Sequence, residues 1–78
     1  KTLFVKNLSF KVDKDGLAEN FREFDGFQDA RIATDKESGR SRGFGYVEFD
    51  SPDNAAEAFQ KMNGADIDGR EIFVDYAE

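Results

Sequence analysis

The most informative stretch of the sequence is RGFGYVEF, residues 42–49, which combines aromatic rings, charges and glycines. If this stretch is a strand, its side chains alternate between two faces. One face carries two large rings between two charges: Arg42, Phe44, Tyr46 and Glu48. The other begins with two glycines, which bury almost nothing: Gly43, Gly45, Val47 and Phe49. Because the charged face should meet water, the pattern predicts exposed rings, which can stack on planar groups beside cations that attract anions.

A second strand-like stretch, TLFVKNL at residues 2–8, supplies a third ring. Leu3 and Val5 share one face of this strand, and Phe4 and Lys6 share the other. Five cations are expected around the three rings: Lys1, Lys6, Arg31, Arg40 and Arg42. Bases stack on rings while Lys and Arg meet phosphates, so this combination predicts binding of single-stranded nucleic acid. RNA and single-stranded DNA both stay open, because no residue can be assigned to a 2′-hydroxyl.

The net charge of −6 at first argues against a nucleic-acid partner. The charges are segregated, however. Residues 1–11 contain three lysines and no acid, and residues 30–47 contain four basic and two acidic residues. Both segments contribute to the aromatic face, and most acids lie elsewhere. We therefore expect weak binding with a shallow salt dependence, because few phosphates can be contacted.

Length and composition exclude several classes of protein. The 78 residues suffice for one domain, residues 1–78, and contain no cysteine and no histidine. Disulfides and thiolate metal sites are therefore excluded, and the commonest general base and metal ligand is missing. No apolar run approaches the roughly 20 residues that a membrane span needs. We expect a monomer without metal, cofactor or membrane contact. The chain opens at Lys1 without a methionine, so we expect a domain cut from a longer protein, whose neighbouring domains raise its affinity.

Apolar spacing and turn signals predict the element order β-α-β-β-α-β. The predicted strands are residues 2–8, 27–34, 42–49 and 71–77, and the second contains irregular spacing that indicates a bulge. The first predicted helix, residues 13–24, has Asp13 as its N-cap. The second begins with Ser51 as N-cap and Pro52 at its first position, and ends at Asn63-Gly64. Asp68-Gly69 is a tight-turn signal.

Each predicted helix has one apolar stripe, so both helices must cover one face of the sheet. The predicted fold class is therefore α+β, a ferredoxin-like sandwich with a four-stranded antiparallel sheet and two helices on one face. Gly43 and Gly45 are expected to face the helices, where a missing side chain lets a backbone come close. The other face has no element left to cover it. The rings expected on this open face are Phe4, Phe44 and Tyr46.

RGFGYVEF resembles the eight-residue signature of the RNA recognition motif family at every defined position: basic, Gly, aromatic, Gly or Ala, aromatic, Val, any, aromatic. LFVKNL, residues 3–8, is similar to that family's six-residue motif on the first strand. The resemblance covers the whole chain. It implies that single-stranded RNA is the partner, that Phe4, Phe44 and Tyr46 are the stacking residues, and that Arg42 meets a phosphate. Glu48 and Asp75 are expected on or near this face. Both carboxylates repel phosphates, so in this respect the sequence differs from family members that bind RNA strongly.

More narrowly, KTLFVKNLSF and DGREIFVDYAE resemble RNA recognition motifs of nucleolin-like proteins. That resemblance implies a multi-domain nuclear protein, located in the nucleolus, that acts on ribosomal RNA precursors in ribosome biogenesis.

Several residues keep two interpretations. Lys6 and Arg31 either contact RNA or form cross-strand ion pairs with Glu48 or Asp75. Phe73 is expected to face outward, either as an accessory base contact or as packing at the sheet edge. All the rings could instead be covered by a protein partner or a terminal helix, which would make the chain a protein-interaction module.

An enzyme is the competing class, because the same element order also builds small acyl-phosphate hydrolases and fold does not settle function. A phosphate-binding loop would need glycines leading into a helix N-terminus. The segment SFKVDKD, residues 9–15, has no glycine and carries two acids. With no Ser-His or Cys-His pair available, we expect no catalytic activity.

Overall fold

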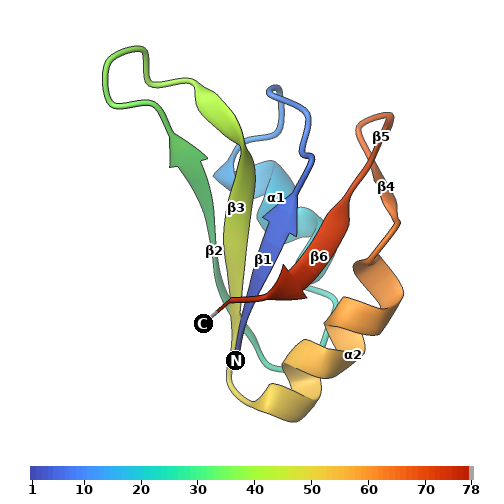
Figure 1. Cartoon of the computed structure of the whole chain (residues 1–78). Helices are drawn as coiled ribbons and strands as arrows, with labels where there is room; N and C mark the ends of the chain where they lie inside the picture. The colour runs from blue at the N-terminus through green and yellow to red at the C-terminus, as the bar shows by residue number, and fades with distance from the viewer. Residues whose placement is uncertain (78) are drawn as a thin grey trace.

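The computed structural model describes residues 1–77 and contains one main sheet backed by two helices (Figure 1). The elements, in chain order, are β1 (Thr2–Lys6), α1 (Lys14–Phe21), β2 (Phe27–Thr34), β3 (Ser41–Phe49), α2 (Pro52–Met62), β4 (Asp66–Ile67), β5 (Arg70–Glu71) and β6 (Phe73–Tyr76). The main sheet has the strand order β2-β3-β1-β6, and every neighbouring pair is antiparallel. The predicted α+β ferredoxin-like fold is confirmed.

The last predicted strand, residues 71–77, is divided in the structure. Its first residue belongs to a separate two-stranded hairpin, in which β4 pairs with β5, and only β6 joins the main sheet. The predicted tight turn connects β4 to β5, with positive φ angles of 55° at Asp68 and 80° at Gly69. Two consecutive left-handed residues are what a two-residue hairpin turn requires.

The interior lies on one side of the main sheet. Buried residues of both helices belong to the same cluster as the inward side chains of the strands: Leu3, Val5, Leu17, Phe21, Val47, Phe49, Ala55, Ala58 and Val74 are among its members. Because both helices pack on this side, the outward side chains of β1, β2, β3 and β6 form an uncovered surface, which we call the open face.

Gly45 behaves as predicted and Gly43 does not. A Cβ on Gly45 would lie 3.2 Å from Leu17 Cδ2 of α1, so this glycine lets the helix approach the sheet. Gly43 has φ +86°, and a Cβ there would lie 3.0 Å from the Phe10 ring, in the loop between β1 and α1. The prediction that Gly43 and Gly45 share one face requires a regular strand, in which side chains alternate with a period of two residues. The register of β2 against β3 shifts between Ile32 and Thr34, and this irregularity removes Gly43 from the helix-facing row.

Helix α1 starts where the sequence predicts and ends earlier. Asp13 is extended and its Oδ1 accepts a hydrogen bond from the Gly16 N–H at 2.8 Å. The helix ends at Phe21 rather than Phe24, because the Phe24 N–H donates back to the Phe21 carbonyl as the chain tightens into a turn. Phe24 still packs against the core.

Removing the Asp13 cap should destabilise the domain measurably. Asp13→Ala is expected to lower the free energy of unfolding by about 1 kcal/mol, which corresponds to a melting temperature lower by roughly 4–8 °C for a domain of this size. Thermal circular dichroism measures the shift. Asp15→Ala removes the same charge from the first turn but leaves the cap bond intact, so it should cost less than half as much. Equal losses in the two variants would contradict the capping role.

Candidate nucleic-acid interface

Three rings form a continuous aromatic cluster at the centre of the open face. Phe4 on β1 lies directly across from Tyr46 on β3, with ring centroids 5.2 Å apart and planes inclined by 21°. Phe44 stands nearly perpendicular to both, at 5.4 Å from Phe4 and 6.5 Å from Tyr46. Tyr46 is 39% exposed, although a ring of this size in a core would be covered completely. The structure therefore brings the three predicted rings together on the uncovered side of the sheet.

Two of the five predicted cations lie against these rings. The Arg42 guanidinium carbon is 5.4 Å from the centre of the Phe44 ring, and Lys6 Nζ is 5.8 Å from the centre of the Phe4 ring. Both distances allow a cation–π attraction. Lys6 also lies 4.0 Å from the Asp75 carboxylate, so the predicted cross-strand ion pair is present. Both partners are exposed, and such pairs contribute little, so Lys6 stays available to an anionic ligand.

Arg31 lies on the open face but pairs differently from either predicted partner. Its Cα is in register with Tyr46, so it borders the aromatic cluster on the β2 side. Its Nε is 3.5 Å from Asp29 Oδ2, a carboxylate two residues away on the same strand. The predicted ion pair with Glu48 or Asp75 is therefore wrong for Arg31. Residues i and i+2 of a strand point to the same face, and the prediction considered only cross-strand neighbours.

The remaining predicted site residues are spread around the cluster. Phe73 on β6 is 45% exposed and in register with Lys6, so it extends the aromatic surface toward the edge strand. Lys1 lies at the other end of the sheet, where its carbonyl accepts a hydrogen bond from the Phe49 N–H at 2.7 Å. Lys1 therefore borders the end of β3, whereas Arg42 stands at its beginning.

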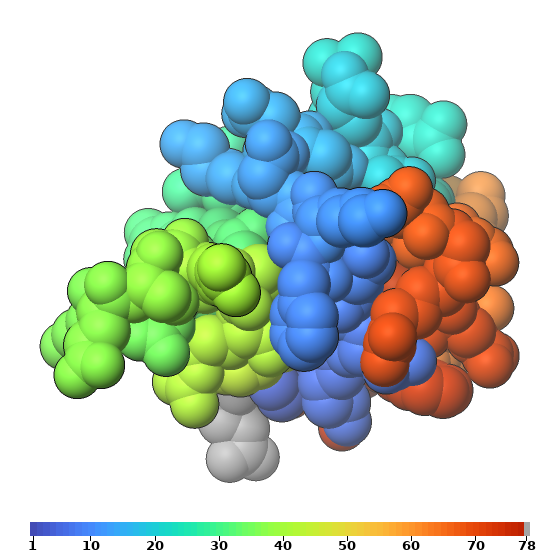
Figure 2. All heavy atoms as spheres, turned by 90° about the horizontal axis from the view of Figure 1, so that it is seen from above, coloured from blue at the N-terminus to red at the C-terminus, as the bar shows by residue number. Residues whose placement is uncertain are grey.

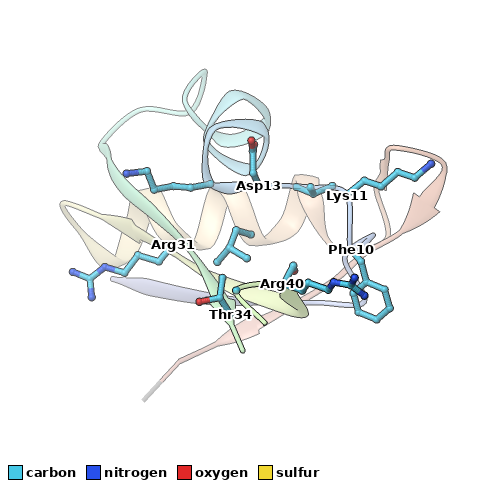
Figure 3. A pocket seen from close by; sticks show the side chains of 11 residues that line it. Phe10, Lys11, Asp13, Arg31, Thr34 and Arg40 are labelled. Carbon is cyan, nitrogen blue, oxygen red and sulfur yellow. The ribbon is translucent and has the colours of Figure 1, made fainter. Parts of the chain in front are cut away.

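Arg40 belongs to a groove beside the open face rather than to the aromatic cluster. This groove, of about 540 Å³, lies between the β1–α1 loop, the α1 N-terminus, β2 and the β2–β3 loop (Figure 3). Lys11, Lys14 and Arg31 line it together with Arg40, and the single acid among its lining residues is Asp13. With four cations and one acid among its lining residues, the groove is cationic overall.

Phe10 is an exposed aromatic residue of this groove that is absent from the predicted site residues. It is 74% exposed and its ring lies against Gly43. Figure 2, viewed from above, shows the β1–α1 loop between the β2–β3 loop and the β4–β5 hairpin, and Figure 1 shows these three segments at one end of the sheet. An aromatic residue between two predicted elements, outside both apolar stripes, was the signal available in the sequence.

Within residues 1–77, no group of three or more His, Cys, Asp or Glu side chains is arranged to hold a metal ion. None of the helices described there has the length and apolarity to cross a membrane.

The sequence of the chain matches one protein family over most of its length. The model of the RNA recognition motif matches residues 3–72. The chain belongs to the RNA recognition motif family. RNA recognition motifs are RNA-binding modules, and this fold supports RNA binding in general.

Three curated proteins illustrate the breadth of similar RNA recognition motifs. The chain is 45% identical over 76 residues to small RNA-binding protein 11, chloroplastic, of Arabidopsis thaliana, covering 97% of this chain and 52% of that protein. It is 42% identical over 78 residues to nucleolin of Gallus gallus, covering 100% and 11%. It is 41% identical over 75 residues to glycine-rich RNA-binding protein 3, mitochondrial, of Arabidopsis thaliana, covering 96% and 24%. The chain thus spans about half or less of each of these relatives.

A solved RNA recognition motif has nearly the same backbone. The second such domain of yeast poly(U)-binding protein Pub1 aligns with a TM-score of 0.96 and 35% identity, covering 99% of this chain and 93% of that chain. The fold and family expected from the two sequence motifs are therefore confirmed. The roles of individual residues on the open face are still predictions.

Proposed function

We propose that this RNA recognition motif binds single-stranded RNA on its open face, with bases stacked on Phe4, Phe44 and Tyr46. The observation that carries the proposal is the exposed aromatic cluster with Arg42 and Lys6 at its rings. Stacking contributes roughly 1–3 kcal/mol per base and tolerates every base, because each base has a π face. Arg42 and Lys6 then contact phosphates of the stacked nucleotides.

The ring orientations suggest a path for the strand. Phe4 and Tyr46 are nearly parallel, so bases on these two rings lie in similar planes. A base on Phe44 has to lie at a steep angle to the others, because that ring is inclined by 85° to Phe4 and 86° to Tyr46. The RNA backbone therefore turns near Phe44, next to the Arg42 guanidinium. Phe73 offers an accessory contact at the β6 edge, and Lys1, Arg31 and Arg40 border the path.

An NMR titration tests the proposal. The isotope-labelled domain is titrated with a pool of short single-stranded RNAs at low salt, and a matched pool of single-stranded DNA is the comparison. Amide shifts are expected to cluster at Phe4, Lys6, Arg42, Phe44 and Tyr46. If nothing on the open face moves at high RNA concentration, RNA binding at this face is excluded, and a protein partner covering the rings becomes the better hypothesis.

The phosphate contact of Arg42 predicts a change in salt dependence. Each phosphate contact that is lost should reduce the slope of log affinity against log salt by about one, so Arg42→Gln should flatten the slope by about that amount. Isothermal titration at four salt concentrations measures it. Arg22→Gln is the matched control, because Arg22 follows α1 and pairs with Glu19 at 3.8 Å. An unchanged slope in the Arg42 variant would exclude the phosphate contact.

We further propose that the domain acts as a monomer within a longer, nucleolin-like protein that binds ribosomal RNA precursors in the nucleolus. The 42% identity to chicken nucleolin supports this role. Relatives named as mitochondrial and chloroplastic are equally similar, so localisation needs a direct test. A fluorescent fusion of the full-length protein should accumulate in the nucleolus, and accumulation in an organelle would contradict the role.

A further inference from the structure

A small hollow lies on the open face beside Tyr46 and is distinct from the groove at the loops. Its volume is about 160 Å³, of the order of one nucleobase, and its lining residues come from three strands: Thr2, Asp29, Arg31, Tyr46 and Glu48. The sheet register makes them neighbours. Arg31 is in register with Tyr46, and Glu48 is in register with both Thr2 and Asp29. Arg31 and Glu48 therefore stand on adjacent sides of the Tyr46 ring.

The two carboxylates of the hollow differ in their partners. Asp29 is fully engaged, because Oδ1 accepts from the Ala30 N–H at 2.9 Å and Oδ2 pairs with Arg31 at 3.5 Å. Glu48 is half-buried, and no hydrogen bond or ion pair joins its carboxylate to any other residue in the described range 1–77. The Glu48 oxygens reach the surface, because no buried side-chain oxygen in the described residues lacks a hydrogen-bond partner, so they are open to a ligand. On a phosphate-binding surface, however, a carboxylate without a partner repels the ligand. Its position is explained if the ligand itself donates hydrogen bonds to it.

We propose that Glu48 reads the base that stacks on Tyr46 and selects guanine. This inference rests on the proposed RNA binding and adds a base preference to it. A carboxylate only accepts hydrogen bonds and has two oxygens. Guanine offers two adjacent donors, N1–H and the N2 amine, which match both oxygens. The Arg31 guanidinium, on the neighbouring side of the ring, can donate to guanine O6, since the Asp29 pair engages only its Nε.

The other bases fit this arrangement less well. Adenine and cytosine each present one amine beside a ring nitrogen that accepts, so only one carboxylate oxygen is satisfied. Uracil presents a single N–H between two carbonyl oxygens, and these repel the carboxylate. The expected order at this position is therefore guanine first, adenine and cytosine next, and uracil last. Single-stranded RNA is read by such hydrogen bonds to the exposed base edges.

Affinities of labelled pentamers test the proposal. UUGUU, UUIUU and UUUUU are compared by fluorescence anisotropy at low salt, where I is inosine, which lacks only the N2 amine of guanosine. A single guanine can slide to its preferred ring, so the register need not be known. The wild-type domain is expected to bind UUGUU about ten-fold more tightly than UUIUU, which loses one of the two hydrogen bonds to the carboxylate. Binding of UUUUU should be weaker than that of UUIUU.

Glu48→Gln is expected to reduce the preference for UUGUU over UUIUU to less than two-fold, while binding of UUUUU stays equal or improves because a negative charge is removed. Glu57→Gln is the charge-matched control, because Glu57 lies on α2 and pairs with Lys61, and it should keep the ten-fold preference. Equal affinity of wild type for the three pentamers, with binding still lost in Tyr46→Ala, would overturn the guanine selection and leave RNA binding intact. Absence of binding by every pentamer, with no shifts at Tyr46, would overturn both.

Discussion

Tyr46→Ala is expected to weaken RNA binding by about 1–3 kcal/mol, which is roughly 5- to 150-fold in the dissociation constant. Tyr46 is the most exposed ring of the aromatic cluster, and it makes no contribution to the buried core. The variant loses the stacking surface of the Tyr46 ring and also one side of the hollow that this ring forms with Arg31 and Glu48. Isothermal titration with a short single-stranded RNA measures the affinity, and thermal circular dichroism measures the stability.

The melting temperature of Tyr46→Ala should change little, because the contacts that truncation removes, among them those with Phe4 and Phe44, lie on the open face. Tyr76→Ala is the matched control. Tyr76 is 50% exposed, on β6, and its ring stacks at 4.8 Å on Phe59 of α2, away from the open face. This second variant should keep RNA affinity and lose stability. The exposed-face model is wrong if Tyr46→Ala lowers the melting temperature as much as Tyr76→Ala and leaves binding unchanged.

The open face could be predicted from the sequence because two independent patterns agree: the alternation of side chains along the strands and the single apolar stripe of each helix. Alternation places Phe4 and Lys6 on one side of β1 and places Tyr46 on one side of β3. Two helices with single apolar stripes can cover only one side of a sheet. Neither step needs side-chain detail, so the four-stranded sheet backed by two helices, the N-caps Asp13 and Ser51 and the exposed ring of Tyr46 agree with the structure. Phe4 and Phe44 lie on the same face but are partly covered by the neighbouring rings.

Side-chain partners and irregular backbone were less predictable. Arg31 pairs with Asp29 on its own strand rather than with Glu48 on the neighbouring strand, and alternation does not rank these two acids. Asp75 lies on β6, at the opposite edge of the sheet from β2, and the strand order was not part of the prediction. Arg40 joins a groove because the loop between β2 and β3 sets its position, and loop paths have no periodicity. Gly43 leaves its predicted row because β3 has two extra residues between the pairs Ile32–Gly45 and Thr34–Ser41, and this irregularity changes the alternation. Each of these differences concerns geometry that the hydrophobic pattern does not encode.

Gly45 connects the fold to the site, because it lies between two cluster rings, Phe44 and Tyr46, on β3. A Cβ at Gly45 would collide with the Arg31 carbonyl oxygen of β2, and would lie 3.2 Å from both Ile32 Cδ1 and Leu17 Cδ2. The carbonyl belongs to a neighbouring strand backbone, so it cannot rotate away as a side chain can. Relief requires separation of β2 from β3 or displacement of α1. Overpacking of this kind costs about 1–3 kcal/mol.

Gly45→Ala is therefore expected to destabilise the domain by about 2 kcal/mol, which lowers the melting temperature by roughly 8–16 °C at this chain length. Urea unfolding and thermal circular dichroism measure the loss. Gly16→Ala is the control, because a Cβ there would lie 3.3 Å from a side-chain oxygen of Asp13, in a helix that favours alanine; its stability should change little. RNA affinity of the folded fraction of Gly45→Ala should fall as well, since strand separation displaces Arg31 from Tyr46. Wild-type stability in this variant would contradict the close approach of the two strands on which the position of the rings depends.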